Sequence, residues 1–147
     1  MELDFALLAD AAATPPDGKL YLIGGGIETI LSPKYPCMHG NLSLVMRFIF
    51  TPMDAGSNHS VKVILIDADG GEVIPALELS LPVPDKFPAM VRAGVSIVGN
   101  LQGLKFEQPG EYRFDISVDD SVKKSIPLYM MEYKAQPETG ETGKTGN

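Results

Sequence analysis

Cysteine is almost absent from this sequence, in which Cys37 is the only one. An intrachain disulfide needs two cysteines and a cysteine-rich metal cluster needs several, so both are excluded. A chain without disulfides fits a reducing compartment, and we therefore predict a cytoplasmic protein. At 147 residues the chain is expected to form one domain, long enough to fold without covalent cross-links.

Basic side chains are also scarce, and the net charge is −7. Nucleic-acid-binding proteins normally carry a stripe of lysine and arginine, whereas the longest basic cluster here is the pair Lys123 and Lys124. No apolar run has the length of a membrane span, and Glu2, Asp4 and Asp10 interrupt what would be the core of a signal peptide. The sequence therefore predicts no nucleic-acid partner, no membrane segment and no secretion signal.

The sequence motifs of common catalytic and nucleotide-binding sites are missing as well. There is no Gly-x-Ser-x-Gly elbow, and the glycine triplet at 24–26 lacks the spacing of a phosphate loop. The only histidines are His39 and His59, so a zinc site would have to use Cys37 or scattered carboxylates. Cys37 and His39 could form a thiol–imidazole pair, but no third orienting residue stands at a recognisable spacing. We predict no catalytic residues, no metal ligands and no cofactor.

Acidic side chains leave one alternative open. Residues 67–70 read Asp-Ala-Asp-Gly, like the start of a calcium-binding EF-hand loop, but the sixth position holds Glu72 where that loop needs glycine. A looser calcium site could combine Asp67 and Asp69 with Asp119 or Asp120. The residues at 67–71 are more typical of a hairpin turn.

What the sequence does contain is a regular alternation of apolar and polar residues. Between residues 109 and 120 this alternation places Tyr112, Phe114, Ile116 and Val118 on one face, which predicts a half-buried antiparallel strand. Tyr112 follows a Pro-Gly turn, where immunoglobulin-like sandwiches place a tyrosine whose hydroxyl bonds back to the turn. Arg113 falls on the opposite face, so it is expected to point to solvent and contribute little to stability.

Other apolar runs have the length of β-strands, and none has the pattern of a clear helix. They lie at 3–13, 19–23, 27–31, 41–50, 61–66, 73–81, 91–98 and 122–131. Residues 99–108 suggest an irregular segment, and Pro127 indicates that the last run is an edge strand. The sequence therefore predicts an all-β fold, a two-sheet antiparallel immunoglobulin-like β-sandwich over residues 1–133. A disordered polar tail is expected at 134–147.

Some apolar side chains fall on faces that should point away from the core. They are Val45, Ile49, Ile64, Ile66, Tyr129 and Met131. Contiguous exposed apolar surface marks partner sites, although the run at 3–13 could instead cover part of this set. An edge strand at 122–131 offers a second route to partners, through strand addition. These features predict a protein partner or self-association.

Several segments of the chain resemble an uncharacterised bacterial family that is catalogued only as a domain of unknown function. They are Asp4 to Ala13, Gly18 to Gly26, His59 to Gly70 and Asn100 to Tyr112. The resemblance covers most of the chain before the tail, and it implies a bacterial origin and a compact β-sandwich but no activity. The second half also resembles immunoglobulin-like sandwiches in general, a fold that hosts many unrelated functions.

These observations predict a non-enzymatic β-sandwich that acts through protein–protein contact, either as a binding module or as an assembly subunit. One alternative is a small-molecule or metal-dependent activity in the loops at one end of the sandwich, using Asp67, Asp69, His39 or His59. Another is a structural subunit of a phage or cellular particle, which differs from the first hypothesis mainly in stoichiometry.

Overall fold

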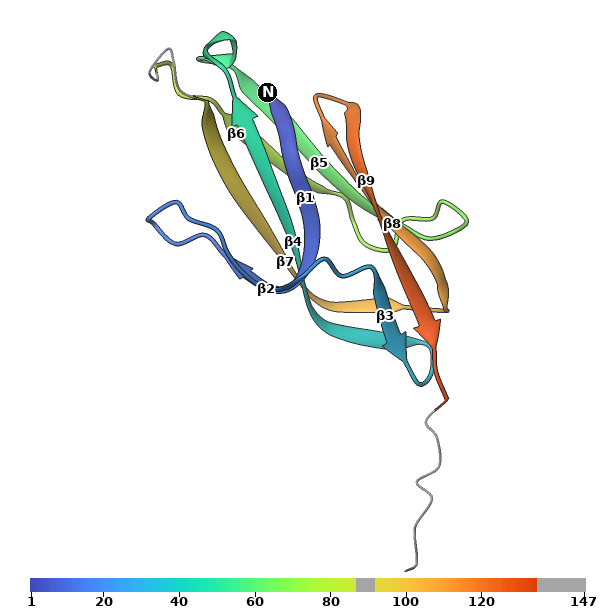
Figure 1. The fold of residues 1–147 in the computed structure, drawn as a ribbon. Helices are drawn as coiled ribbons and strands as arrows, with labels where there is room; N and C mark the ends of the chain where they lie inside the picture. The colour runs from blue at the N-terminus through green and yellow to red at the C-terminus, as the bar shows by residue number, and fades with distance from the viewer. Residues whose placement is uncertain (87–91, 135–147) are drawn as a thin grey trace, which may run out of the picture.

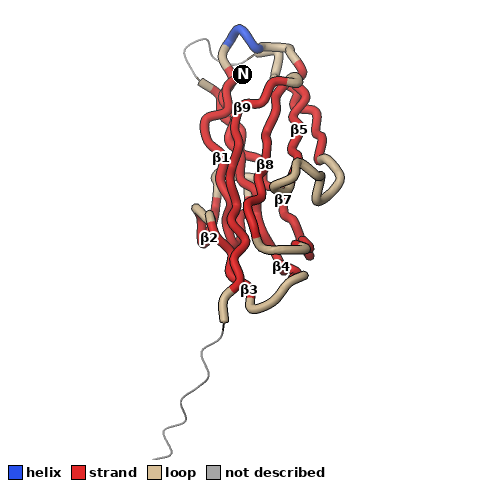
Figure 2. Tube along the Cα trace, turned by 90° about the vertical axis from the view of Figure 1, so that its right-hand side faces the viewer, coloured by secondary structure: helices blue, strands red, loops and turns tan. Residues whose placement is uncertain are grey.

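The computed structural model describes residues 1–86 and 92–134, which form two β-sheets around one hydrophobic core (Figures 1 and 2). The strands are β1 (Glu2–Ala13), β2 (Tyr21–Gly25), β3 (Thr29–Ser32), β4 (Cys37–Phe50), β5 (Asn58–Ile66), β6 (Leu77–Pro82), β7 (Ala93–Phe106), β8 (Gly110–Val118) and β9 (Ser121–Glu132). Sheet A has the order β2-β1-β4-β7, and sheet B has the order β3-β9-β8-β5-β6. The predicted all-β class with two sheets is confirmed.

The only helical turn in the described residues is a short 3-10 segment, Pro52–Asp54. Across the same residues, no helix combines the length and the apolar character that a bilayer span requires. The predicted tail at 134–147 lies outside the described residues from position 135 onward. The same holds for Phe87 and Pro88, at the end of the proline-rich connection after β6.

The core is built from the alternating apolar residues of the long strands. On β4 the inward residues Leu42, Leu44, Met46, Phe48 and Phe50 are all buried, as their spacing of two predicts. Burying a side chain of this size contributes about 1.5–3 kcal/mol to folding. The predicted inward face of β8 is buried in the same core.

Tyr112 forms the corner that its position after the Pro-Gly turn predicts. Its hydroxyl donates a hydrogen bond to the carbonyl oxygen of Gln108 at 2.8 Å. Its ring packs edge-on against Phe106, with a centroid distance of 4.9 Å and an interplanar angle of 83°. Burial raises the pKa of the Tyr112 phenol, so the hydroxyl keeps its proton as a donor. This corner fixes the loop between β7 and β8 to the start of β8.

The chain passes from sheet A to sheet B just after the glycine triplet. The amide N–H groups of Gly26 and Ile27 both donate to the carbonyl of Leu8 in β1, at 2.8 and 3.1 Å. The N–H of Tyr129 in β9 donates to the carbonyl of Glu28 at 2.8 Å. β3 then continues beside β9 as a parallel pair. The bend predicted at 24–26 is thus one of the points where the chain crosses between the two sheets.

The position of β3 corrects in part the prediction that the last run is an edge strand. β9 lies between β3 and β8 in the sheet order, but only Tyr129 and Met130 pair on both sides. Pro127 lies just before this covered part, on a stretch that pairs only with β8. The proline is tolerated there because no second ladder needs its missing N–H.

Two other strands differ in extent from the prediction. β7 runs without a break through the segment expected to be irregular, and it pairs with β4 along its whole length. Gly103 has φ +64°, a conformation that glycine adopts without steric cost. Leu101 and Leu104 are three residues apart, so in a regular strand they would point to opposite faces. The bend at Gly103 lets both side chains reach the core. β6 is shorter than expected, because regular pairing with β5 begins only at Leu77.

Candidate functional site

Two of the six residues predicted to form an interface are buried within sheet A. Val45 is 0% exposed and Ile49 is 9% exposed, so the expectation that they point to open surface is wrong. β4 is a central strand, and Val45 lies opposite Leu7 of β1 and Val98 of β7. These two neighbours flank the valine on both sides and contribute to its burial. β1 therefore shields these residues from its place beside β4, which is the alternative left open by the sequence.

Two other predicted residues are exposed together on the outer face of sheet B. Tyr129 is 41% exposed and Met131 is 51% exposed. The parallel pairing of β3 with β9 puts Leu31 opposite Met131, and Leu31 is 58% exposed. We call Leu31, Tyr129 and Met131 the outer patch. Leu31 could not be assigned to it from the sequence, because nothing in the local pattern pairs residues 29–32 with the end of the chain.

The last two predicted residues, Ile64 and Ile66, lie on the same face of sheet B but are half-buried. The ladder places Ile64 opposite Asp115 and Ile66 opposite Arg113 in β8. β8 and the first part of β9 therefore separate these isoleucines from the outer patch. The structure brings Tyr129 and Met131 together and keeps Ile64 and Ile66 apart from them.

Arg113 lies on the exposed face of β8, as the alternation predicts, but its side chain is held in an ion pair. Its Nε lies 2.8 Å from Oδ1 of Asp115, and Asp115 is only 7% exposed. The hydroxyl of Ser125 donates to the same Asp115 oxygen at 2.5 Å. A carboxylate this buried needs such partners, so we now expect Arg113 to hold Asp115 and to contribute more to stability than its exposure suggests.

The proposed calcium site fails on topology. Asp67 follows the end of β5 and Asp119 follows the end of β8, and these strands are antiparallel, so the two aspartates lie at opposite ends of the sheet. Asp67 instead accepts hydrogen bonds from the N–H groups of Asp69 at 2.9 Å and Gly71 at 2.8 Å. The hairpin-turn prediction is confirmed. Within residues 1–86 and 92–134, no three His, Cys, Asp or Glu side chains are grouped to hold a metal ion.

Cys37 and His39 stand at the start of β4, where both are half-buried. In the described part of the chain, no hydrogen bond joins the thiol to the imidazole, and the buried Nε2 of His39 has no partner at all. Cys37 packs against the core. His59, in β5, lies near Asp54, which follows the far end of β4. The two histidines therefore do not share a site.

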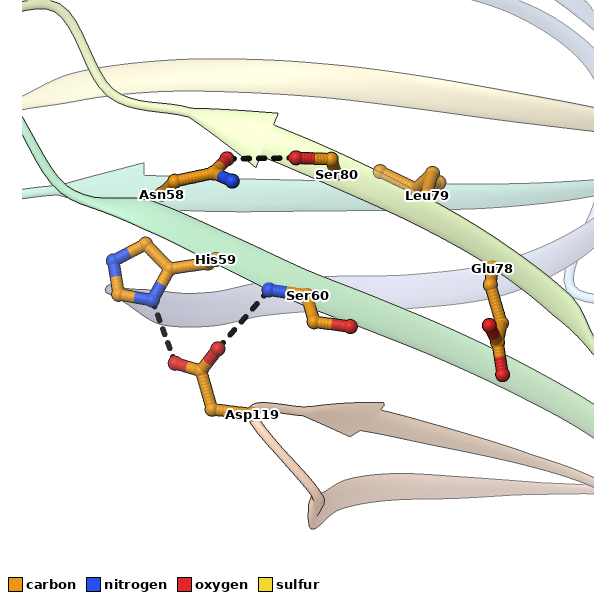
Figure 3. A pocket seen from close by; sticks show the side chains of 7 residues that line it. All are labelled: Asn58, His59, Ser60, Glu78, Leu79, Ser80 and Asp119. Atoms are coloured by element: carbon orange, nitrogen blue, oxygen red, sulfur yellow. Dashed lines mark hydrogen bonds and ion pairs between the residues drawn. The ribbon is translucent and has the colours of Figure 1, made fainter.

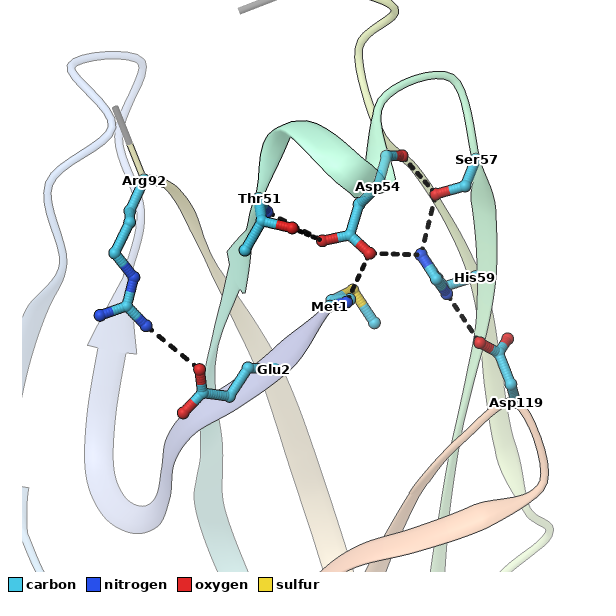
Figure 4. A network of polar contacts seen from close by, with 8 residues as sticks. All are labelled: Met1, Glu2, Thr51, Asp54, Ser57, His59, Arg92 and Asp119. Carbon is cyan, nitrogen blue, oxygen red and sulfur yellow. Dashed lines mark hydrogen bonds and ion pairs between the residues drawn. The ribbon is translucent and has the colours of Figure 1, made fainter. Parts of the chain in front are cut away.

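A cluster of polar groups that the sequence did not predict surrounds His59 (Figure 4). Nδ1 of His59 lies 2.7 Å from Oδ2 of Asp119, and Nε2 lies 2.9 Å from Oγ of Ser57. Asp54 is 3.9 Å from the same Nε2 and receives the amino group of Met1 at 2.6 Å. Hydrogen bonds from His59 and from the Ser60 N–H lower the pKa of Asp119. The only sequence signal was a serine two residues before a histidine at the start of a strand.

The Ser57, His59 and Asp119 arrangement has the outline of a hydrolase triad, but its hydrogen bonds run the wrong way. The Ser57 hydroxyl has a single proton, and it donates to the backbone carbonyl of Asp54 at 2.5 Å. That proton is therefore not directed at the His59 ring, as a serine nucleophile would require. The Ser57 N–H also bonds to the Asp54 carbonyl, so it is not free to stabilise an oxyanion. The cluster is a clamp that ties β1, the 52–57 loop, β5 and the β8–β9 turn together.

The clamp predicts a specific pH dependence for the variant Asp54→Asn. The Met1 ammonium and the Thr51 N–H lower the pKa of Asp54 to about 2, so the ionised form stabilises the fold above the ordinary pKa of 3.8. This contribution is lost as the pH falls through 2. The free energy of unfolding of the wild type should exceed that of the variant by about 1 kcal/mol at pH 6, after allowance for solvent screening. This difference should disappear near pH 2.

Urea unfolding of both proteins between pH 2 and pH 7 measures this difference. Asp69→Asn, which changes an exposed carboxylate in a distant turn, is the matched control and should show no such pH-dependent gap. If the stability difference between wild type and Asp54→Asn stayed constant down to pH 2, the ionised carboxylate of Asp54 would not be what stabilises the fold.

A polar hollow of about 360 Å³ lies beside the clamp on sheet B (Figure 3). Its lining residues are Asn58, His59, Ser60, Glu78, Leu79, Ser80 and Asp119. The Ser80 hydroxyl donates to Asn58 at 2.8 Å, Glu78 pairs with Lys62 at 3.5 Å, and Asp119 is held by His59. Because these groups already have partners, the hollow offers little to orient a small ligand.

A second exposed apolar surface lies on β2 and the adjoining part of β1. It includes a groove of about 490 Å³ lined by Ala11, Ala12, Ala13, Leu20, Tyr21, Leu22 and Ile23. Tyr21 is 51% exposed and Ile23 is 74% exposed. The sequence predicted a strand here but gave no sign that all of it would be exposed, because its apolar residues are typical of a covered strand.

The similarity of the chain to other proteins identifies a family but no activity. None of the curated proteins matches it. A family of unknown function, DUF6941, matches residues 4–131, which is most of the described structure, and the expected resemblance to an uncharacterised family is confirmed. The chain therefore belongs to the family of unknown function DUF6941.

Proposed function

We propose that this domain is a non-catalytic protein-binding module that contacts its partner through the outer patch. The observation that carries the proposal is the exposure of three large apolar side chains, Leu31, Tyr129 and Met131, side by side on two paired strands. Adjacent exposed apolar groups of this kind mark contact surfaces. Tyrosine and methionine are also among the residue types enriched in the centres of protein interfaces.

The surroundings of the outer patch support the same reading. Arg113, on the neighbouring part of sheet B, has half of its side chain exposed and is held in place by Asp115. Arginine is enriched at interfaces, and a guanidinium fixed by an ion pair loses less conformational entropy on binding than a free one. Ile64 and Ile66 add half-buried apolar area beyond it. An interface centred on the outer patch can therefore extend across the face of sheet B.

We propose further that the fold is immunoglobulin-like. The neighbours β1-β4-β7 in sheet A and β9-β8-β5-β6 in sheet B follow the order of strands A-B-E and G-F-C-C′ of that fold. The Tyr112 corner supports this assignment, because the fold places such a tyrosine at the start of strand F. Phe114 then occupies the position of the second disulfide cysteine of antibody domains, and its ring fills the core in place of a disulfide.

The proposal places the domain in the cytoplasm. The supporting feature is the single cysteine of the chain, which is half-buried against the core. A sandwich whose core is held by packed side chains, without a disulfide, keeps its stability under reducing conditions.

Photo-crosslinking in the cells of origin tests the function. A benzoylphenylalanine at position 131 should give a discrete adduct with a partner, whereas the same residue at Met53, which is 96% exposed in the 52–54 turn, should not. An adduct with another protein supports a binding module, and an adduct with a second copy supports an assembly subunit. Equal adduct formation at both positions, or none at 131, would overturn the proposal.

A further inference from the structure

The strand β2 is an open edge of sheet A, which has the order β2-β1-β4-β7. One side of β2 pairs with β1 from Ala9 to Ala13, and no strand of the described chain pairs with the other side. All 5 residues of β2 are exposed. An edge strand of this kind presents unpaired N–H and C=O groups that can accept another strand.

β2 carries no charged side chain and no proline, which are two of the devices that prevent edge pairing. It is short, with 5 residues against 4 in β3, and Gly24 has φ +64°, so its regular part is Tyr21 to Ile23. β6 carries Glu78 and ends at Pro82, β7 carries Lys105, and β3 has only 4 residues. From Leu20 to Ile27 the chain has neither a charge nor a proline. β2 is therefore the edge best suited to accept a strand.

The side chains of β2 favour association as well. Tyr21, Leu22 and Ile23 follow one another and are 51%, 38% and 74% exposed. In Figure 1 the hairpin formed by β2 and the end of β1 projects from the body of the domain. Its apolar groove lies against the same strand.

The charge distribution indicates which partner this edge fits. Each chain carries a net charge of −7, so two identical chains repel each other over most of their surfaces. The uncharged stretch from Leu20 to Ile27 is a place where two copies can meet without opposing like charges. A twofold axis brings the same strand of each copy together in antiparallel orientation, which is the simplest closed arrangement for identical chains.

We propose that the protein forms a dimer in which β2 pairs with β2 of a second copy, in antiparallel register about Ile23. The pairing joins the two A sheets into one continuous sheet and places the exposed apolar side chains of the two hairpins next to each other. It goes beyond the proposed function, because it uses sheet A and a second copy of this chain, whereas the outer patch lies on sheet B.

The small size of the contact sets the strength of the dimer. A pairing of two short strands buries less than the roughly 1,200–2,000 Å² of a standard stable interface. The dissociation constant is therefore expected at about micromolar concentration or weaker. The equilibrium should be visible across a concentration series from about 1 μM to 1 mM.

Light scattering on the full chain across this series tests the proposal. The mass of the wild type should rise from 15.8 kDa toward double that value. Ile23→Lys should remain at the monomer mass, because it places two ammonium groups against each other at the twofold axis. Met131→Lys, a matched change on the outer patch, should still dimerise. A wild type that stays monomeric throughout, or a dimer that survives Ile23→Lys, would overturn the proposal.

A disulfide test checks the register directly. In a Cys37→Ala background, Ile23→Cys should form an interchain disulfide on mild oxidation, because paired strands bring the Cα atoms within the roughly 4.4–6.8 Å that a disulfide needs. Met53→Cys in the same background should give little cross-linking. Equal yields at the two positions would contradict pairing about Ile23. Neither experiment depends on the outer patch, so failure here and failure of the binding-module proposal are distinguishable.

Discussion

Replacing Phe114 by alanine is expected to destabilise the protein by about 3–5 kcal/mol, the usual cost of emptying a phenylalanine site in a closed core. Phe114 is 0% exposed. Its cross-strand neighbours, Leu65 in β5 and Ile126 in β9, are both buried. Leu65 and Ile126 are fixed by the pairing of β8 with β5 and with β9. They cannot move into the volume of the removed ring, so the cavity should persist. The loss is a large part of the stability of a typical domain of this size.

Urea unfolding measures this effect as a shift of the midpoint by about 2 M at an unchanged slope. The control is Glu111→Ala, which removes an exposed side chain from the same strand and should shift the midpoint very little. A loss below about 1 kcal/mol for Phe114→Ala would show that the core around β8 collapses onto the site, contrary to the packing described above.

Arg113→Ala is expected to cost about 2 kcal/mol, much more than a surface arginine usually contributes. The reason is that the variant leaves the carboxylate of Asp115 buried with only the Ser125 hydroxyl as a described side-chain partner. A buried charge that loses its counter-charge is strongly unfavourable. The cost stays below that of a fully buried ion pair, because the Arg113 side chain is half exposed to water.

A double-mutant cycle isolates this interaction. The single variants Arg113→Ala and Asp115→Ala are compared with the double variant, and the coupling between them should be about 1–2 kcal/mol. Glu111→Ala again serves as the control, combined with Asp115→Ala, and should show additive effects. Additivity of Arg113→Ala with Asp115→Ala would mean that the ion pair does not stabilise the fold.

The two proposed contact surfaces have a joint consequence for how the protein binds. The outer patch lies on sheet B and the β2 edge lies on sheet A, so occupation of one does not block the other. A dimer formed through β2 would present two outer patches. Partners with repeated binding sites would then be bound with higher avidity than a single patch provides.

The sequence alone determined where most of the strands lie and which of their side chains face the core. A period of two fixes which side chains share a face, so the apolar alternation is enough to assign Leu42 to Phe50 and Tyr112 to Val118 to the core. Local turn chemistry fixed the Asp67 turn and the tyrosine corner at Tyr112. These features depend on residues that are neighbours in the chain, and for this reason they can be predicted from it.

Only the tertiary structure decided which strands become neighbours. The pairing of β3 with β9 exposes Leu31 beside Met131, and the flanking of β4 by β1 and β7 buries Val45. His59 and Asp119 meet across sixty positions of sequence. Each outcome depends on side chains that lie far apart in the chain and are brought together by ladder pairing. No periodicity within one segment carries that information.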